Sequence, residues 1–194
     1  MNLPKQIILA SRSPRRKHLL EEIGIEFSIH PSDFEEKDAD LSPQDIVLHN
    51  AIGKAQDVAR HYKDALVIGV DTIGVVNEHI LTKPKDKEDA KRLLRLLSNT
   101  THRVLSGVCV IDADTKKMVT SIEETLVTID RLEEDDIEGY VNSGEGEDKA
   151  ASYAIQGKGA LFIKKINGDY FNVVGLPIYK LKQILKEFGV KKWF

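Results

Sequence analysis

Two kinds of hydrophobic pattern alternate along the chain, and they predict strands and helices in turn. Residues 6–10 (QIILA) and 65–70 (ALVIGV) are nearly continuous apolar runs, which is typical of strands that are covered on both faces. Polar residues follow each run directly. The second strand is therefore expected to end at Asp71 and Thr72.

Further apolar runs, bounded by turn-forming residues, predict the rest of a sheet. The expected strands are a short one at 25–30, a hairpin over 73–84, a long antiparallel pair at 101–112 and 118–129, and a second hairpin with arms at 160–166 and 170–174. The sequence ADTKK joins the long pair as a short polar turn.

Helices are expected between these strands, and capping residues mark where they begin. Ser13 followed by Pro14 predicts the N-cap and the first position of a helix that ends at Gly24. Ser42 and Pro43 predict the start of the next helix in the same way. Further helices are expected at 86–98, 133–144 and 177–189. Elements mixed in this order predict an α/β fold with a twisted mixed β-sheet flanked by helices.

Composition limits the class of protein further. The 194 residues fit one domain, 1–194, and contain 41% hydrophobic and 30% charged residues with a formal net charge of -3, which is typical of a soluble globular protein. The negative charge argues against stable binding of nucleic acid. The single cysteine, Cys109, has apolar neighbours and is expected to be a buried thiol. Because no apolar run is long enough for a signal peptide or a membrane span, we expect a cytoplasmic protein.

The stretch ASRSPRRKHLL at 10–20 places hydroxyl and cationic side chains directly after the first predicted strand. Free N–H groups and the helix dipole attract anions to the start of a helix. The residues expected around that point are Ser11, Ser13, Arg15 and Arg16. The stretch therefore predicts a phosphate-binding site. The alternatives are an N-cap followed by solvent-exposed basic residues, and a phosphorylation or localisation motif.

Carboxylates in two segments are candidate catalytic groups and metal ligands. Asp71 is expected at the carboxyl end of the central strand, where ligands of open α/β sheets collect. Glu35 and Glu36 lie in an acidic loop over 31–42. Carboxylate oxygens are the ligands that Mg²⁺ and Mn²⁺ prefer. The alternative interpretations are a turn aspartate and a solvated acidic loop.

Two further segments present polar groups of interest. Lys54 lies beside the apolar stripe of its helix, so its ammonium is expected either to reach a specific partner or to extend into solvent. In YAIQGKGALF, Gly157 and Gly159 suit a tight turn or a close approach of the backbone to a ligand. Gln156 offers a donor and an acceptor to a nucleobase edge. An ordinary glycine-rich hairpin is the alternative.

Six segments between Ile8 and Ile184 form a characteristic series: LASRSPRR, VIGVDT, LTKP, LLSNTTHRVLSGV, KAASYAIQGKGALFI and INGDYFNVVGLP. In this order they resemble the Maf family, also called septum-formation inhibitor Maf-like proteins. The resemblance implies a twisted mixed sheet with two lobes around a central cleft, related to the inosine triphosphate pyrophosphatases, and a homodimer. It also implies a house-cleaning hydrolysis of nucleoside triphosphates to monophosphate and pyrophosphate, linked to cell-division arrest.

The resemblance also assigns roles by position. Asp71 matches the catalytic acid or base. The family positions linked to substrate choice correspond to Arg15, Thr72 and Gln156 of this chain. The polar positions of the family's cleft correspond to Ser13, Glu36, Lys54 and Lys83. The cations would neutralise the triphosphate, and Glu36 with Asp71 would hold Mg²⁺ or Mn²⁺. The sequences DT and IQG resemble the subgroup that acts on dTTP and UTP.

Other functions stay open at this point. One is a regulator or sensor of cell division that binds nucleotide without hydrolysing it, and another is a pyrophosphatase that prefers 7-methyl-GTP or non-canonical purines. The chain also departs from the usual family pattern. Ala151 stands where glycine is common, which suggests a packing change, and VLHNAIGKA has His49 and Asn50 near positions where arginine and leucine are frequent. No role is assigned to His49.

Overall fold

The computed structural model describes residues 5–37, 41–191 and 193. The chain divides into two compact units, and each is assembled from separated segments. The first unit contains residues 1–72, 106–123 and 175–194, and the second contains residues 73–105 and 124–174. A single domain over the whole chain stays a prediction. Residues 38–40 of the predicted acidic loop lie outside the described residues.

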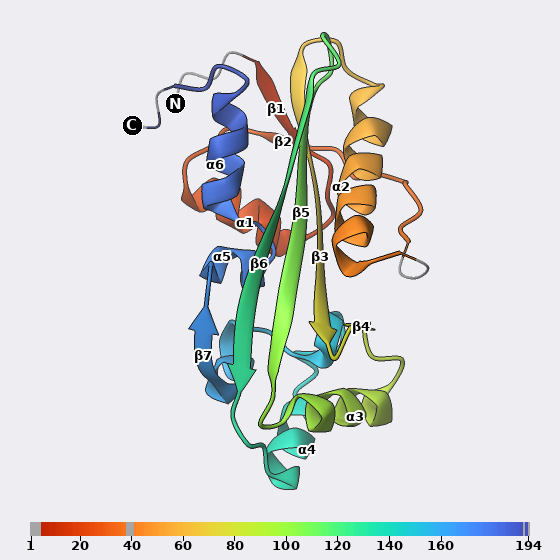
Figure 1. Cartoon of the computed structure of the whole chain (residues 1–194), viewed down its shortest axis with the longest axis vertical. Coiled ribbons are helices and arrows are strands. Elements are labelled where there is room, and N and C mark those ends of the chain that lie inside the picture. Colours follow the sequence, from red (N-terminus) through yellow and green to blue (C-terminus); the bar gives the residue numbers. More distant parts are fainter. Residues whose placement is uncertain (1–4, 38–40, 192, 194) are drawn as a thin grey trace. The chain divides into compact units, whose positions relative to one another are not determined.

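Most of the predicted elements are present (Figure 1). The first unit holds β1 (Gln6–Leu9), α1 (Pro14–Glu22), β2 (Ser28–Ile29), α2 (Pro43–Ala59) and α6 (Ile178–Lys186). The second holds β4 (His79–Leu81), α3 (Lys87–Leu97), α4 (Glu134–Asn142), β7 (Ile163–Asn167), α5 (Tyr170–Val174) and two 3₁₀ helices, Ala150–Ser152 and Gly157–Phe162. Strands β3 (Ala65–Val76), β5 (Thr101–Asp112) and β6 (Met118–Ile129) have residues in both units.

The strands of the described residues form one mixed sheet in the order β2-β1-β3-β5-β6-β7, with β4 paired to β3. Strand β1 is parallel to β2 and to β3, with Ile8 opposite Val67. Strand β4 is antiparallel to β3, with Gly74 opposite Leu81, and β7 is antiparallel to β6. The predicted α/β fold with a mixed sheet flanked by helices is therefore confirmed.

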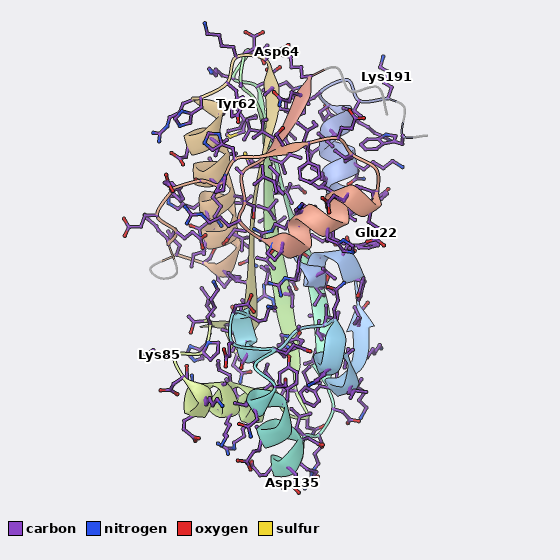
Figure 2. All side chains as sticks on the ribbon, turned by 180° about the vertical axis from the view of Figure 1, so that it is seen from behind. Glu22, Tyr62, Asp64, Lys85, Asp135 and Lys191 are labelled. Atoms are coloured by element: carbon purple, nitrogen blue, oxygen red, sulfur yellow. The ribbon has the colours of Figure 1, made fainter. Side chains whose placement is uncertain are left out.

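In the first unit α2 lies along β3 (Figure 1). The two elements approach closely because Gly69 has no side chain: a Cβ there would lie 2.2 Å from the carbonyl oxygen of Ala51. The predicted apolar stripe of α2 is buried, and it includes Val47, Ala51, Ala55 and Val58. Tyr62 and Asp64 follow in the turn that leads into β3 (Figure 2).

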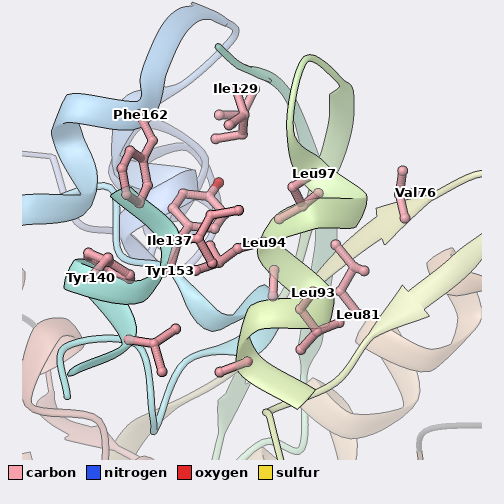
Figure 3. Close-up of a cluster of buried hydrophobic side chains, with 14 of the residues drawn as sticks. Val76, Leu81, Leu93, Leu94, Leu97, Ile129, Ile137, Tyr140, Tyr153 and Phe162 are labelled. Carbon is pink, nitrogen blue, oxygen red and sulfur yellow. The ribbon is translucent and has the colours of Figure 1, made fainter. Parts of the chain in front are cut away.

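The second unit has an apolar core of its own, in which leucines of α3 and the first turns of α4 meet (Figure 3). Leu94 and Leu97 from α3 are almost fully buried, as is Ile137 from α4. The rings of Tyr140 and Phe162 pack edge to face in the same cluster, with centroids 5.0 Å apart. Leu81 and Tyr153 belong to this core, and they lie two and three residues before Lys83 and Gln156.

Some predicted strands are wrong in type or extent. Residues 170–174 form α5 and not the second arm of a hairpin, and β7 pairs with β6 instead. The side chain of Asp169 accepts a hydrogen bond from the N–H of Phe171, which favours a helical start over a hairpin turn. The strand predicted over 25–30 is reduced to Ser28–Ile29.

The departure at Ala151 concerns the backbone as well as the packing. Ala151 has φ 64° and Ser152 has φ 59°, a left-handed conformation that glycine adopts without steric cost and alanine does not. Both residues are buried. The glycine that the resemblance leads one to expect would suit this conformation.

Among the described residues, no helix has the length and apolar character that crossing a bilayer requires.

Candidate active site

Asp71 lies inside β3 and does not end it. The strand was expected to stop at Asp71 and Thr72, but it continues to Val76 because residues 74–76 pair with β4. Inter-strand hydrogen bonds therefore extend the strand beyond its apolar run. The carboxyl group of Asp71 is consequently held on a rigid element, and Asp71 is only 5% exposed.

Lys54 lies on α2, and its ammonium contacts two carboxylates. Its Nζ lies 2.8 Å from Oδ1 of Asp71 and 2.8 Å from Oε1 of Glu36, and it also donates to the carbonyl oxygen of Val70 at 3.3 Å. Lys54 is only 8% exposed. Of the two orientations that the sequence left open, the structure shows the one with a specific partner.

Asn50, one helical turn before Lys54, contacts the other oxygen of the same aspartate. Its Nδ2 donates to Oδ2 of Asp71 at 3.0 Å and to the carbonyl oxygen of Lys37 at 2.8 Å, while its Oδ1 accepts from the N–H of Lys37 at 2.8 Å. The sequence suggested no role for Asn50, and its only signal was the unusual VLHNAIGKA segment. Glu35 and Glu36 are both exposed, and Glu36 reaches the site through its contact with Lys54.

Arg16 connects the start of α1 to the segment around Thr72. The guanidinium donates through Nε to the carbonyl oxygen of Gly175 at 2.8 Å, through Nη1 to Oγ of Ser11 at 3.1 Å and through Nη2 to Oγ1 of Thr72 at 3.1 Å. Oγ1 of Thr72 also lies 2.8 Å from Oγ of Ser106. These contacts bring Ser11, Arg16 and Thr72 together.

The charged groups that shift the pKa of Arg16 lie near its guanidinium. Burial lowers the pKa of Arg16, and Asp71 and Glu36 oppose this shift while Arg15 adds to it. An arginine stays protonated in proteins even so. The cationic start of α1 and the two carboxylates therefore lie within electrostatic range of one another.

Ser13 and Pro14 begin α1 as predicted, although the serine does not cap the helix in the usual way. Among the described residues, the side chain of Ser13 makes no capping hydrogen bond, and its N–H donates to Oγ of Ser11 at 3.2 Å. The first turn has no acidic residue. The positive end of the helix dipole therefore has arginines and no carboxylate in its first turn. This is the arrangement expected of an anion site.

Lys83 and Gln156 belong to the second unit and are exposed. Gln156 precedes Gly157, which has φ +74°, and the following turn is organised by Glu145. The carboxylate of Glu145 accepts the N–H of Lys158 at 2.9 Å and that of Gly159 at 2.9 Å. Burial raises the pKa of Glu145, but these hydrogen bonds lower it overall. No pattern in the sequence indicated this contact between Glu145 and the turn.

The family described as Maf-like protein matches residues 6–188. The chain belongs to the Maf family.

Three curated relatives in the family cover nearly all of the chain, and each is named dTTP/UTP pyrophosphatase. A protein from Bacillus anthracis is 50% identical over 187 residues, which is 96% of this chain and 97% of that protein. A Dictyoglomus turgidum protein is 46% identical over 187 residues, covering 95% and 97% of the two chains. A Methanosarcina barkeri protein is 44% identical over 188 residues, covering 96% and 95%.

Two carboxylates, those of Glu36 and Asp71, are the candidate metal ligands of the Maf site. Within the described ranges, no group of three or more histidine, cysteine, aspartate or glutamate side chains could hold a metal ion. Glu36 and Asp71 do contact a common ammonium. Two carboxylates completed by substrate phosphates are a ligand set that Mg²⁺ uses, so these residues fit a divalent ion.

Proposed function

We propose that this chain hydrolyses dTTP and UTP to the monophosphate and pyrophosphate. The observation that carries the proposal is the buried pair of Asp71 and Lys54, which the exposed Glu36 joins, near the cationic start of α1. A carboxylate placed next to an anion-binding helix end is the pairing that attack of water on a phosphate requires. Relatives named dTTP/UTP pyrophosphatase support the choice of substrate.

In this proposal Asp71 acts as the general base. Lys54 and Asn50 each occupy one of its oxygens, but a carboxylate has about four acceptor positions, so both oxygens can still accept a proton from water. The two contacts fix the plane of the carboxylate. The proton of the water that attacks the α-phosphorus would therefore pass to a group that is already oriented.

The cations of the first unit bind the triphosphate. Arg15, together with Ser11, Ser13 and the N–H groups of the first turn of α1, would hold phosphate oxygens. Arg16 contributes positive charge and keeps Thr72 in place. Stabilisation of charge that develops in the transition state is the main source of catalysis in such reactions.

Glu36 and Asp71 would hold Mg²⁺ or Mn²⁺. When bound, the ion neutralises phosphate charge and lowers the pKa of water. The roles of Lys83 as a phosphate contact, and of Thr72 and Gln156 in the choice of a pyrimidine base, stay predictions from the resemblance. The homodimer is also a prediction from the resemblance, and the cytoplasmic location is a prediction from the sequence.

The decisive experiment is a nucleotide panel. Purified protein is incubated with Mg²⁺ or Mn²⁺ and with dTTP, UTP, 7-methyl-GTP or ITP, and monophosphate and pyrophosphate are measured. We expect pyrophosphate from dTTP and UTP, and none from Asp71→Asn with the same folded circular dichroism spectrum. Preference for 7-methyl-GTP or ITP would replace the substrate class, and tight binding without turnover would favour the nucleotide sensor.

A further inference from the structure

The loop that carries Glu36 is attached along one face of α2. Near the end of the helix, Oδ2 of Asp57 accepts a hydrogen bond from the hydroxyl of Ser32 at 2.7 Å and another from the N–H of Asp33 at 2.9 Å. These bonds lower the pKa of Asp57, the one from Ser32 most strongly. The beginning of the loop is therefore fixed to the helix by an ionised carboxylate.

The middle of the loop packs directly on the helix backbone. The ring of Phe34 lies over Gly53, where a Cβ would be only 2.3 to 2.5 Å from three ring carbons. The same ring lies 5.6 Å from the ring of His49, measured between centroids. His49, for which the sequence suggested no function, thus contacts the loop.

Asn50 holds the part of the loop next to Glu36 and contacts Asp71 of β3 at the same time. Both the N–H and the carbonyl oxygen of Lys37 are bonded to its amide, and its remaining Nδ2 hydrogen points to Oδ2 of Asp71. Asn50 is 2% exposed. An amide has two donor hydrogens, and here both are used.

We propose that Asn50 is a positioning residue that holds Glu36 and Asp71 in a fixed relation to each other. The inference rests on the proposed function, in which these carboxylates serve one cation and one water. Lys54 also joins them, but through a single flexible ammonium. The planar amide of Asn50 instead fixes the backbone next to Glu36 and one oxygen of Asp71.

As a consequence, the carboxylates of Glu36 and Asp71 need to move little when the cation and the substrate bind. Side chains that orient metal ligands from outside commonly change metal affinity or activity by about 10–100-fold when they are replaced. Replacement of Asn50 should therefore change the dependence on the cation more than it changes binding of the nucleotide.

The test compares Asn50→Leu with Gln56→Leu, which makes the same kind of change at an exposed position of the same helix. Hydrogen–deuterium exchange without metal or nucleotide reports on the loop: the Lys37 amide should exchange about tenfold faster in Asn50→Leu. The Mn²⁺ concentration that gives half-maximal dTTP hydrolysis should rise about tenfold or more, and the KM for dTTP at saturating Mn²⁺ should change by less than about threefold. Gln56→Leu should match the wild type in all three measurements.

A second variant, Asn50→Asp, keeps an acceptor for the Lys37 N–H but removes both bonds that Nδ2 donates, the one to Asp71 and the one to the carbonyl oxygen of Lys37. We expect it to keep slow exchange at Lys37 and still to need about tenfold more Mn²⁺, and it tests the role even where the leucine variant fails to fold. Unchanged Mn²⁺ dependence in both variants, with normal wild-type turnover, overturns the positioning role alone. A wild type that hydrolyses no nucleotide overturns the proposed function, and the inference with it.

Discussion

Nζ of Lys54 lies 2.8 Å from Oδ1 of Asp71, and the two residues are only 8% and 5% exposed. Charges that are this well buried interact strongly, and each depends on the other because both have lost most of their hydration. The pair joins α2 to the middle of β3, where the candidate catalytic carboxylate is located. The pair therefore stabilises the first unit and also positions the candidate catalytic carboxylate.

Removing the cation of this pair should destabilise the protein. In Lys54→Met, Asp71 stays buried next to Glu36 without its ammonium, and the free energy of unfolding should fall by about 3–5 kcal/mol. Urea unfolding measures this loss. Adding Asp71→Asn removes the unpaired charge, so the double variant should be more stable than Lys54→Met alone. Equal stability of the two would show that the pair is not coupled.

His102 in the second unit should make the protein sensitive to acid. It is 1% exposed, its Nε2 lies 2.8 Å from the hydroxyl of Tyr153, and burial lowers its pKa from 6.5 to about 4. Between these two values the unfolded chain binds a proton that the folded protein does not. Stability should thus decline as the pH falls below 6.5, by about 2 kcal/mol at pH 5 and about 3 kcal/mol at pH 4.

Urea unfolding between pH 7 and pH 4.5 measures this loss, with His102→Gln as the comparison. The variant should be less stable at pH 7 because its fit in the core is poorer, but its stability should decline less steeply over this range. Parallel pH profiles for the two proteins would mean that the pKa of His102 is not lowered in the folded protein.

Cys109 should not react in the folded protein. The thiol is fully buried within β5, and burial raises its pKa to about 12. Because only the thiolate is nucleophilic, Ellman's reagent at pH 8 should label no cysteine in the native protein and one per chain in 6 M guanidinium chloride. Rapid labelling without denaturant would contradict the burial of this strand. The sequence prediction of a buried thiol is confirmed.

Replacing Gln156 tests base recognition without an expected change in the stability of the protein. Its side chain is exposed, so Gln156→Leu should unfold at the same urea concentration as the wild type. If Gln156 hydrogen-bonds a pyrimidine edge, the variant should lose about tenfold in kcat/KM for dTTP and UTP, the effect of one such bond. A steady-state comparison with Lys158→Leu, another exposed position in the same loop, provides the control. Equal losses in both would assign the effect to the loop and not to the base contact.

Several site residues could be predicted because their signals are local or belong to short motifs. Ser13 and Pro14 begin a helix for reasons that lie within one turn of chain. The same holds for Ser42, whose side chain accepts a hydrogen bond from the N–H of Asp45. Asp71 stood out because it directly follows the most apolar run, at the expected carboxyl end of a strand, where ligands of open α/β sheets collect.

Other features could not be predicted, because they depend on partners far away along the chain. The continuation of β3 beyond Asp71 results from pairing with β4. Arg16 bonds the carbonyl oxygen of Gly175, 159 residues later. Residues 170–174 look like a strand by composition, since aromatic and β-branched side chains favour strands, yet they form α5.

The sequence by itself determined which segments are helices or strands in most of the chain, where the caps lie, and which six segments resemble one family. Periodicity and capping act over a few residues, so they can be read without knowing the path of the chain. Only the tertiary structure decided that Lys54 turns to Asp71 and that Asn50 joins this aspartate to the loop of Glu36. These contacts form because packing of α2 against β3 excludes water and leaves each buried polar group to find its partner within the protein.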